Sequence, residues 1–418
     1  MGSLITLPLD LPNIEVLKTD TNADGDYLIT VTSTLDSTRC HKCGRDIRKL
    51  HGYDQMLQLR HLPILGRRVY LQIRPKRLEC PYCSDHPTTT QKLEWYQPKS
   101  PHTQAYEEHV LLQLVHSTLQ DVSCKEQLGY DAVAGVVERG ISPRVDWTAW
   151  AALEVLGLDE IALKKGHRDF VAIVSARLPG GQVVVLAVLP DRQKETVKAF
   201  LQSIPEPLRR TIHTVCTDMW EGYVNAVYEV FGREEGYSVE VVVDRFHVAE
   251  KYHAGPDLLR KKELKRLKQE LSDEAYQQIQ GVLWPLRKSS SDLQPEEAAL
   301  LDRLFAYSPT LQQAYTLRED LTAIFEQPLS KADATLQINA WCADVHASGL
   351  KCFDSFLTTL HNWLDEITNY FHHRYTSGFV EGLNNKIKVL KRRCYGILKV
   401  THLFQRLYLD LEGYRRFA

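Results

Sequence analysis

Three aspartates that follow apolar, strand-like runs are the residues of this sequence best suited to hold a divalent metal ion. Asp159 follows VLGL, Asp218 ends TIHTVCT and Asp244 ends VEVVV. Because neighbouring strands of a sheet lie about 5 Å apart, acids at several strand ends can converge at one edge of it. Clustered carboxylates repel one another unless a hard cation neutralises them, and Mg²⁺ prefers a few carboxylates with phosphate oxygens and water. The pattern therefore predicts a magnesium site.

Each aspartate taken singly also has a structural interpretation. A strand-end aspartate often caps the helix that follows it. Asp244 before RFHVAEKYH and Asp218 before MWEGY both fit that alternative, whereas no obvious helix follows Asp159. We therefore treat Asp244 as an auxiliary candidate only.

Glu381 is a fourth acid, on a segment (SGFVEGLNNKIKVLKRR) predicted to be a helix that packs against the same sheet edge. Asn384, Asn385 and Lys388 lie three, four and seven residues after it, near one helix face. A carboxylate in a stripe of amides and lysines suits a metal on one side and DNA phosphate on the other. The predicted DNA contacts of this helix are Asn384, Asn385, Lys388, Lys391 and Arg392.

The chemistry that such acids support is phosphoryl transfer. Two Mg²⁺ (or Mn²⁺) ions about 3.5–4 Å apart can activate an attacking water or hydroxyl and stabilise the leaving oxygen of an in-line displacement. His167 and His247 are candidate phosphate contacts, but a lone histidine is usually structural, so neither is placed in the core site.

Four of the nine cysteines form two close pairs, Cys40-x₂-Cys43 and Cys80-x₂-Cys83. Four thiolates complete a tetrahedral shell for one structural Zn²⁺ and leave no open position for chemistry. The odd cysteine total and the paired spacing favour a reducing cytoplasm with bound metal over disulfides. The intervening bases, among them Arg67 and Arg68, predict that this module binds DNA ends.

The charge distribution supports a nucleic-acid partner although the net charge is only −2. Residues 41–77 carry ten Lys or Arg against two acids, residues 260–268 hold six bases, and residues 381–418 have nine bases against three acids. Such basic segments suit a protein that grips phosphates at chosen places, although any one run alone reads as a solvated face. No apolar stretch approaches the roughly 18 residues of a membrane span.

The order of predicted elements divides the chain into five segments. Short β-like runs in 1–100 form the zinc-binding domain, and two short helices around Gly129 predict a helix-turn-helix domain in 101–153, with plain helical packing as the alternative. Residues 154–255 read β-β-β-α-β-α-β, an α/β core on a mixed sheet. A helical insertion follows in 256–374, and final helices carrying Glu381 in 375–418 complete the core.

Together, CHKC, CPYC, GLDEIALKKGH, VCTDMWEGY, VVDRFHVAEKYH and SGFVEGLNNKIKVLKRRCYG resemble DDE transposases of the ISL3 family of bacterial insertion sequences. The resemblance implies a zinc-binding N-terminus, a helix-turn-helix and a ribonuclease H-like core interrupted by an insertion. It further implies that Asp159, Asp218 and Glu381 are the catalytic triad and that Lys388 touches DNA. The near-neutral net charge is less basic than expected of a transposase.

The function expected from this resemblance is binding of the element's terminal inverted repeats, cleavage at its ends and joining of 3′-hydroxyl ends to target DNA. Because two ends must be paired, a homodimer is expected. The main alternative is a zinc-dependent, sequence-specific DNA-binding regulator with a non-catalytic scaffold, which leaves the acids unexplained. A resolvase-like nuclease and a tyrosine recombinase using 372–375 are less favoured, the latter because four adjacent residues cannot supply its dispersed basic ligands.

Overall fold

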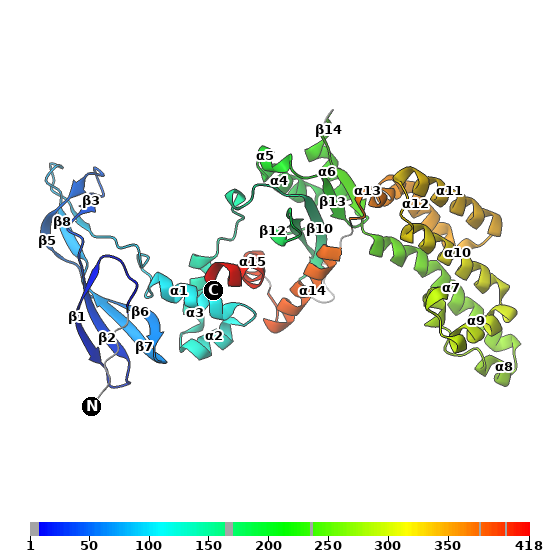
Figure 1. The fold of residues 1–418 in the computed structure, drawn as a ribbon, viewed down its shortest axis with the longest axis horizontal. Coiled ribbons are helices and arrows are strands. Elements are labelled where there is room, and N and C mark those ends of the chain that lie inside the picture. Colours follow the sequence, from blue (N-terminus) through cyan, green and yellow to red (C-terminus); the bar gives the residue numbers. More distant parts are fainter. Residues whose placement is uncertain (1–7, 164–169, 235–236, 376–377, 398) are drawn as a thin grey trace. The chain divides into compact units, whose positions relative to one another are not determined.

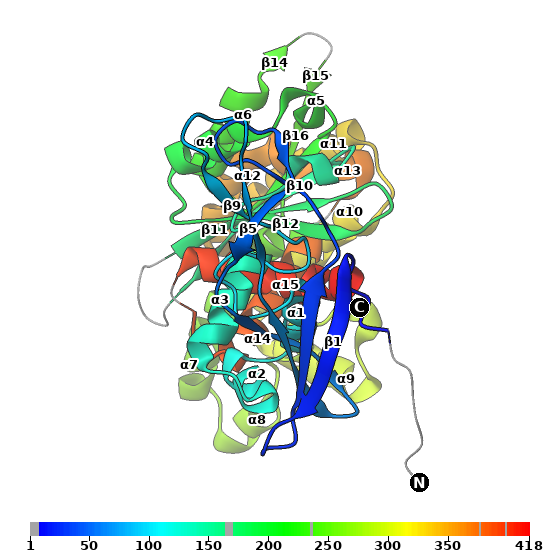
Figure 2. The same ribbon diagram turned by 90° about the vertical axis from the view of Figure 1, so that its left-hand side faces the viewer.

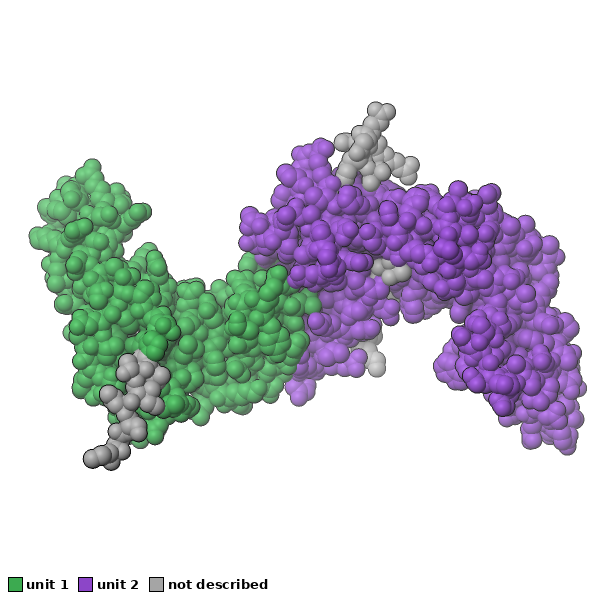
Figure 3. All heavy atoms as spheres, viewed as in Figure 1, with its two compact units in different colours: residues 1–143, 408–418 green, residues 144–407 purple. Residues whose placement is uncertain are grey.

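The computed structural model describes residues 8–163, 170–234, 237–375, 378–397 and 399–418. The chain divides into two compact units, Met1–Pro143 with Tyr408–Ala418, and Arg144–Leu407 (Figure 3). None of the helices in the described stretches combines the length and apolarity that crossing a bilayer requires.

The first unit begins with three small sheets. The largest has the order β1-β2-β7-β6, and alternate residues such as Val31, Val69 and Leu71 point into a shared core. A β3-β4 pair and a β5-β8-β9 sheet flank the cysteines. The strands are β1 (Ile14–Thr21), β2 (Tyr27–Ser33), β3 (Thr38–Arg39), β4 (Asp46–Ile47), β5 (Lys49–Tyr53), β6 (Leu57–Ile64), β7 (Arg67–Ile73), β8 (Lys76–Glu79) and β9 (Thr88–Thr90).

Three helices follow these sheets in the first unit: α1 (Gln104–Leu114), α2 (Leu119–Glu126) and α3 (Tyr130–Gly140). Thr103 and Thr118 cap α1 and α2 by accepting backbone N–H groups, and Gly129 precedes α3. The two short helices expected around Gly129 are therefore present. Their apolar faces, including Tyr106 and Val136, enclose a common core.

The second unit is built on a five-stranded sheet with the order β12-β11-β10-β13-β16 (Figures 1 and 2). The strands β10 (Val155–Ala162), β11 (Phe170–Arg177) and β12 (Val183–Leu189) are antiparallel neighbours, whereas β13 (Thr214–Thr217) and β16 (Glu240–Val243) run parallel to β10. The remaining elements of this region are η1 (Trp147–Ala149), α4 (Lys194–Ser203), α5 (Glu206–Arg209), α6 (Glu221–Phe231), β14 (Arg233–Glu234) and β15 (Tyr237–Ser238).

Helices cover both faces of this sheet. Leu156 and Leu158 of β10 pack with α4 and α6 on one face, whereas Val155 and Cys216 join the core of the later helices on the other. The predicted order β-β-β-α-β-α-β is confirmed, and with it the ribonuclease H-like α/β class. Gly180 and Gly181, with φ of 93° and 88°, form the predicted turn between β11 and β12.

Helices make up most of the rest of the described chain, as predicted. They are α7 (Arg245–Glu270), α8 (Asp273–Gln277), η2 (Pro285–Arg287), η3 (Ser290–Asp292), α9 (Pro295–Tyr307), α10 (Pro309–Glu326), α11 (Lys331–Ser348), η4 (Lys351–Phe353), α12 (Asp354–Thr368), α13 (Tyr370–His373), α14 (Gly378–Arg393) and α15 (Val400–Phe417). Caps such as Ser308 on α10 and Ser330 on α11 start new helices where the chain turns.

Two segment boundaries differ from the prediction. A proline usually ends a helix, but α7 continues through Pro256, so the boundary at 255/256 falls inside one helix. The C-terminal part of α15 belongs to the first unit, so the segment 375–418 does not lie wholly with the α/β core as predicted. Leu409 packs among the apolar side chains of α1–α3, and Asp410 accepts the His116 backbone N–H at 3.0 Å.

Candidate active site and metal centre

The three predicted aspartates lie in one row across three adjacent parallel strands, Asp159 within β10 and Asp218 and Asp244 directly after the last residues of β13 and β16. Gly157 pairs with Cys216 between β10 and β13, and Thr217 pairs with Val243 between β13 and β16. Because the register advances one residue at a time, it places Asp159 beside Asp218 and Asp218 beside Asp244. Residues 155 and 216 of the same strands pack on the face covered by the later helices, so the row lies on that face.

α14 can reach this row because Gly157 has no side chain. A Cβ atom at Gly157 would collide with the Val380 side chain and would lie 2.7 Å from Ser175 Oγ and 3.0 Å from Phe379 Cε2. Four residues along a helix rise about 6 Å, and two residues along a strand rise about 6.6 Å. The turn after Val380 therefore meets Asp159, where Asn384 Nδ2 donates a hydrogen bond to Asp159 Oδ2.

Glu381 lies on the exposed side of α14, in its first turn. Asn384 follows three residues later and is buried, and residues at this spacing are neighbours about 5–6 Å apart. Glu381 is thus next to the group that holds Asp159. Among the described residues, no preformed cluster of metal-ligand atoms unites Glu381 with the two aspartates, so the assembled triad stays a prediction.

The predicted stripe on α14 is divided between two faces. Asn384 and Lys391, seven residues apart, face the sheet, and Lys391 Nζ donates to the Ala162 carbonyl oxygen. The exposed stripe is Glu381, Asn385, Lys388 and Arg392. Asn384 is therefore placed to orient Asp159, which differs from the DNA contact expected for it, and Lys391 anchors α14 to β10. Lys388, Asn385 and Arg392 remain open to a ligand.

Burial and like charge raise the pKa values of Asp159 and Asp218. Burial, followed by the charges of Asp159 and Glu160, raises the pKa of Asp218 to about 6. Burial also raises the pKa of Asp159, opposed by the Glu160 backbone N–H at 2.6 Å and by Asn384. Neighbouring carboxylates repel one another when both are ionised. A bound cation would remove this repulsion and stabilise their ionised forms.

Two buried oxygens of the site have no hydrogen-bond partner among the described residues: Asp218 Oδ1 and Asn384 Oδ1. A buried acceptor without a donor is costly unless something fills its place. Asp218 also does not cap α6, whose N-cap residue is Trp220 and which has no side-chain cap. An oxygen set of this kind fits a hard divalent cation held by Asp159 and Asp218.

Asp244 does cap α7, because its carboxylate accepts the Phe246 backbone N–H at 2.9 Å. The structural interpretation of this residue is therefore confirmed. It nonetheless stands at the end of the row, and its charge raises the pKa of Asp159. Its auxiliary role stays a prediction.

His247 is a neighbour of the site that sequence reasoning set aside. Its charge lowers the pKa of both Asp159 and Asp218, so it stands within electrostatic reach of them. The sequence feature that could have indicated its place near the site is its position three residues after Asp244. Arg192 pairs with Glu160 at 2.6 Å and opposes the rise in the pKa of Asp218, a contact with no signal in the sequence. His167 lies outside the described residues.

Gly157→Ala is expected to destabilise the protein by about 1–3 kcal/mol, because the added methyl forces α14 away from β10. The matched control is Gly382→Ala on α14, where nothing lies within 4 Å of the added atom. That change should stabilise the fold by about 0.5–1 kcal/mol through helix propensity. Thermal unfolding measures both, and equal shifts for the two variants would refute the close approach.

Asn384→Ala is expected to weaken Mg²⁺ binding by the protein by about 10–100-fold, the usual cost of removing a group that orients a metal ligand. Its control is Asn385→Ala, the exposed neighbour on the same helix. The control should leave Mg²⁺ binding unchanged even if it weakens DNA binding. The same Mg²⁺ titration curve for both variants would contradict the orienting role.

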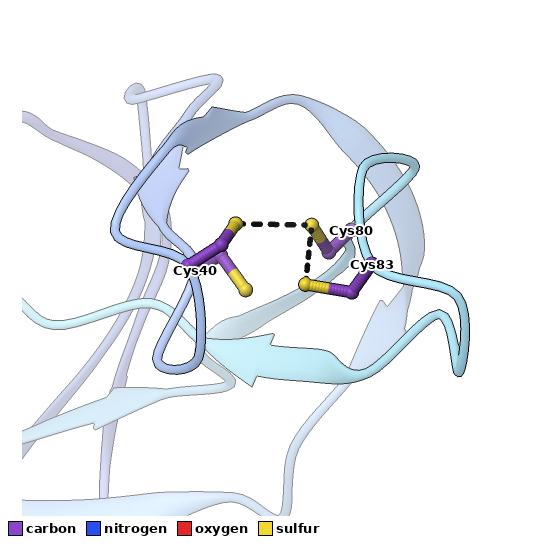
Figure 4. Close-up of side chains that lie close together, drawn as sticks. Cys40, Cys80 and Cys83 are labelled. Carbon is purple, nitrogen blue, oxygen red and sulfur yellow. Dashed lines mark hydrogen bonds between the residues drawn. The ribbon is translucent and has the colours of Figure 1, made fainter.

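The four predicted zinc ligands come together in the first unit. The Sγ atoms of Cys40, Cys43, Cys80 and Cys83 all lie within 4.8 Å of one another, and the Cys43–Cys80 and Cys80–Cys83 sulfurs are each 3.7 Å apart. Zn–S bonds of about 2.3 Å in a tetrahedron give sulfurs about 3.8 Å apart, so the spacing fits zinc. Figure 4 shows the side chains of Cys40, Cys80 and Cys83 close together, with their sulfurs directed toward a shared space.

The backbone prepares this cluster for a cation. N–H groups of Cys43 and Lys42 lower the pKa of Cys40 to about 6, whereas burial and the neighbouring thiols raise that of Cys83 to about 12. The first turn closes through a hydrogen bond from the Gly44 N–H to the Cys40 carbonyl at 2.9 Å, with Gly44 at φ 71°. A positive ion would stabilise all four sulfurs as thiolates.

Arg67 and Arg68, predicted as DNA contacts, have protein partners in the structure. Arg68 Nε donates to Asp26 at 2.8 Å and its Nη1 to Gln127 at 3.0 Å. Arg67 lies over the Tyr27 ring, 5.7 Å from its centroid. These bonds fix the two side chains on the sheet, and their role toward DNA stays a prediction.

Comparison with known proteins places these features in a family. A family model for ISL3-type DDE transposases, described as a transposase, matches residues 156–407, which include all four acids, and a model for the zinc finger of the transposases of IS204, IS1001, IS1096 and IS1165 matches residues 36–83. The chain is similar to the transposase for insertion sequence element IS1001 of Bordetella parapertussis, with 29% identity over 90% of this chain and 89% of that protein.

Further similarities are more distant. The transposase for insertion sequence element IS1557 of Mycobacterium tuberculosis is 23% identical over 90% of this chain and 86% of that protein. The Drosophila P element transposase strand transfer complex is 11% identical with a TM-score of 0.42, covering 74% of this chain and 91% of that one. The family models and the IS1001 relative decide the assignment: this chain belongs to the ISL3 family of transposases and carries the family's N-terminal zinc ribbon.

Proposed function

We propose that this protein cuts DNA at the ends of an insertion sequence and joins the freed 3′-hydroxyl ends to target DNA. The observation that carries the proposal is the row of Asp159 and Asp218 on adjacent parallel strands, with Asn384 of the Glu381 helix bonded to Asp159. Helix capping, the usual structural role of an aspartate after a strand, does not explain why these acids converge from separate elements.

We assign different roles to the acids. Asp159 and Asp218 would hold the divalent ions, and Glu381 on the exposed side of α14 would complete the ligand set once DNA is bound. Mg²⁺ or Mn²⁺ held there would supply Lewis-acid activation of the attacking water and would neutralise charge on the phosphate. Water oxygen forms a new bond to phosphorus, the bond from phosphorus to O3′ breaks, and O3′ takes up a proton. In the joining step, the oxygen of that hydroxyl would form a bond to a target phosphorus and lose its proton. The bond from that phosphorus to the target O3′ would break, and this O3′ would take up a proton.

Lys388, Asn385 and Arg392 extend from Glu381 along the exposed face of α14 and would contact the phosphates beside the scissile bond. The zinc ribbon and the α2–α3 pair would recognise the terminal inverted repeats. Because joining requires two ends, the active form would be a homodimer on DNA.

The test uses the full-length protein and duplexes that carry the inverted repeats flanking its gene, with Mg²⁺ and a plasmid target. The expected products are nicks at the repeat ends with 3′-hydroxyl termini and repeat DNA covalently joined to the plasmid. Sequence-specific binding without any cleavage, in either Mg²⁺ or Mn²⁺, would instead support the regulator alternative.

A further inference from the structure

We infer that α7 is a DNA-binding track that leads away from the active site along the helical insertion. This inference rests on the proposed function and adds a partner surface to it. The starting observation is that α7 is one continuous helix of 26 residues that begins at Arg245, directly after Asp244. Figure 1 shows it leaving the sheet and running along the other helices of the insertion.

One face of α7 combines His247, the neighbour of the acids described above, with a series of lysines. Starting from His247, the positions at successive spacings of four and three residues are Lys251, Ala254, Leu258, Lys261, Lys265 and Lys268. This spacing drifts by only about 20° per seven residues, so the seven side chains follow one stripe along the helix. We call these seven residues the α7 stripe.

The α7 stripe carries no acid, and its lysines are exposed. Within the described parts of the chain, none of these lysines forms an ion pair. Two arginines of α7 outside the stripe behave differently: Arg260 pairs with Asp257 at 3.3 Å, and Arg266 pairs with Glu263 at 2.7 Å and also with Glu270. These arginines neutralise the acids Asp257, Glu263 and Glu270 of α7. The positive charge of the stripe lysines is therefore available to an external anion.

The position and length of the stripe favour duplex DNA as that anion. Its first member, His247, stands within electrostatic reach of Asp159 and Asp218. Lys268 comes 21 residues later, a rise of about 32 Å, close to the 34–36 Å of one turn of duplex DNA. A duplex whose scissile phosphate lies at the acids could therefore place successive backbone phosphates along the same helix. The lysines would contact DNA phosphates as point charges, and such contacts do not depend on the base sequence.

The test compares two triple variants of the full-length protein. Lys261→Gln, Lys265→Gln and Lys268→Gln together remove charge from the α7 stripe. Lys194→Gln, Lys198→Gln and Lys351→Gln remove equal charge elsewhere in the same unit, where Lys194 and Lys198 pair with Glu229 at the surface and Lys351 lies before α12. Binding to a repeat-bearing duplex with its flanking DNA is measured against salt concentration in Mg²⁺-free buffer.

For the stripe variant, the slope of log affinity against log salt should fall by about two to three, with binding about tenfold weaker or more near 0.1 M salt. The control should keep the wild-type slope. Equal slopes for both variants would overturn the inference, as would an unchanged slope with loss of the dimer, which would assign the stripe to protein assembly. Cleavage by the wild-type protein is assayed in parallel. Absence of cleavage would refute the proposed function, whereas the salt slopes would still test whether the α7 stripe binds DNA.

Discussion

Asp218→Asn is expected to lower Mg²⁺-dependent cleavage of repeat-end DNA by about a thousandfold or more, while binding of that DNA changes little. Metal ions at such sites contribute several kcal/mol of transition-state stabilisation, and each 1.36 kcal/mol is a factor of ten in rate. The amide keeps the size of the side chain but removes the charge that binds the cation. Because Asp218 Oδ1 has no hydrogen-bond partner among the described residues, the substitution breaks no hydrogen bond of that atom.

The control for this variant is Asp302→Asn, which removes one exposed carboxylate from α9 in the same unit. It should cleave at the wild-type rate. Gel assays of nicking and mobility-shift assays of binding separate the two activities. Cleavage by the Asp218 variant within tenfold of wild type would remove Asp218 from the proposed site.

The same residue sets an expected pH dependence. Its pKa in the folded protein is about 6, above the ordinary value of 3.8, so ionising it costs folding stability progressively as pH rises from about 4 to 6 in metal-free protein. Mg²⁺ binds the ionised form, so the thermal stabilisation that Mg²⁺ confers should grow over that range. Cleavage should likewise fall below about pH 6. The Asp218→Asn variant should lose the Mg²⁺-dependent part of both profiles.

Cys40→Ser is expected to reduce bound zinc from about one ion per chain to nearly none and to abolish binding of the repeat ends. Three thiolates and a hydroxyl form a far weaker shell than four thiolates, and structural zinc sites contribute about 10 kcal/mol or more to the folding of small domains. The β3-β4 pair and the second cysteine turn have few apolar contacts besides Ile47 and Leu78, so they depend on the ion.

Cys124→Ser is the matched control, because Cys124 is exposed on α2 and lies outside the four-sulfur cluster. It should retain full zinc content and end binding. Elemental analysis of the purified proteins measures zinc, and repeat-bearing duplexes measure binding. A Cys40 variant with undiminished zinc would exclude this residue from the ligand shell. Mg²⁺-dependent nicking of nonspecific DNA should survive in the variant, because the acids lie in the other unit.

Local sequence patterns determined much of this protein. The paired CxxC spacing identified all four sulfurs, because each pair forms its own turn regardless of the structure of the segment between the two pairs. Alternating apolar runs and the Pro-Gly-Gly turn identified β10, β11 and β12, since period and turn residues are local properties. Acids after the apolar runs located Asp159, Asp218 and Asp244, and their order along the chain required only that the strands share a sheet.

Tertiary structure alone decided how these parts meet. Only the β10-β13-β16 register sets the acids in one row, because pairing between distant strands leaves no mark within either strand. The phase of α14 is set by Val380 packing over Gly157, which turns Asn384 inward to Asp159 and leaves Glu381 on the exposed side. Helical periodicity gives the spacing of side chains around an axis, but the direction in which each one points depends on the surface against which the helix packs.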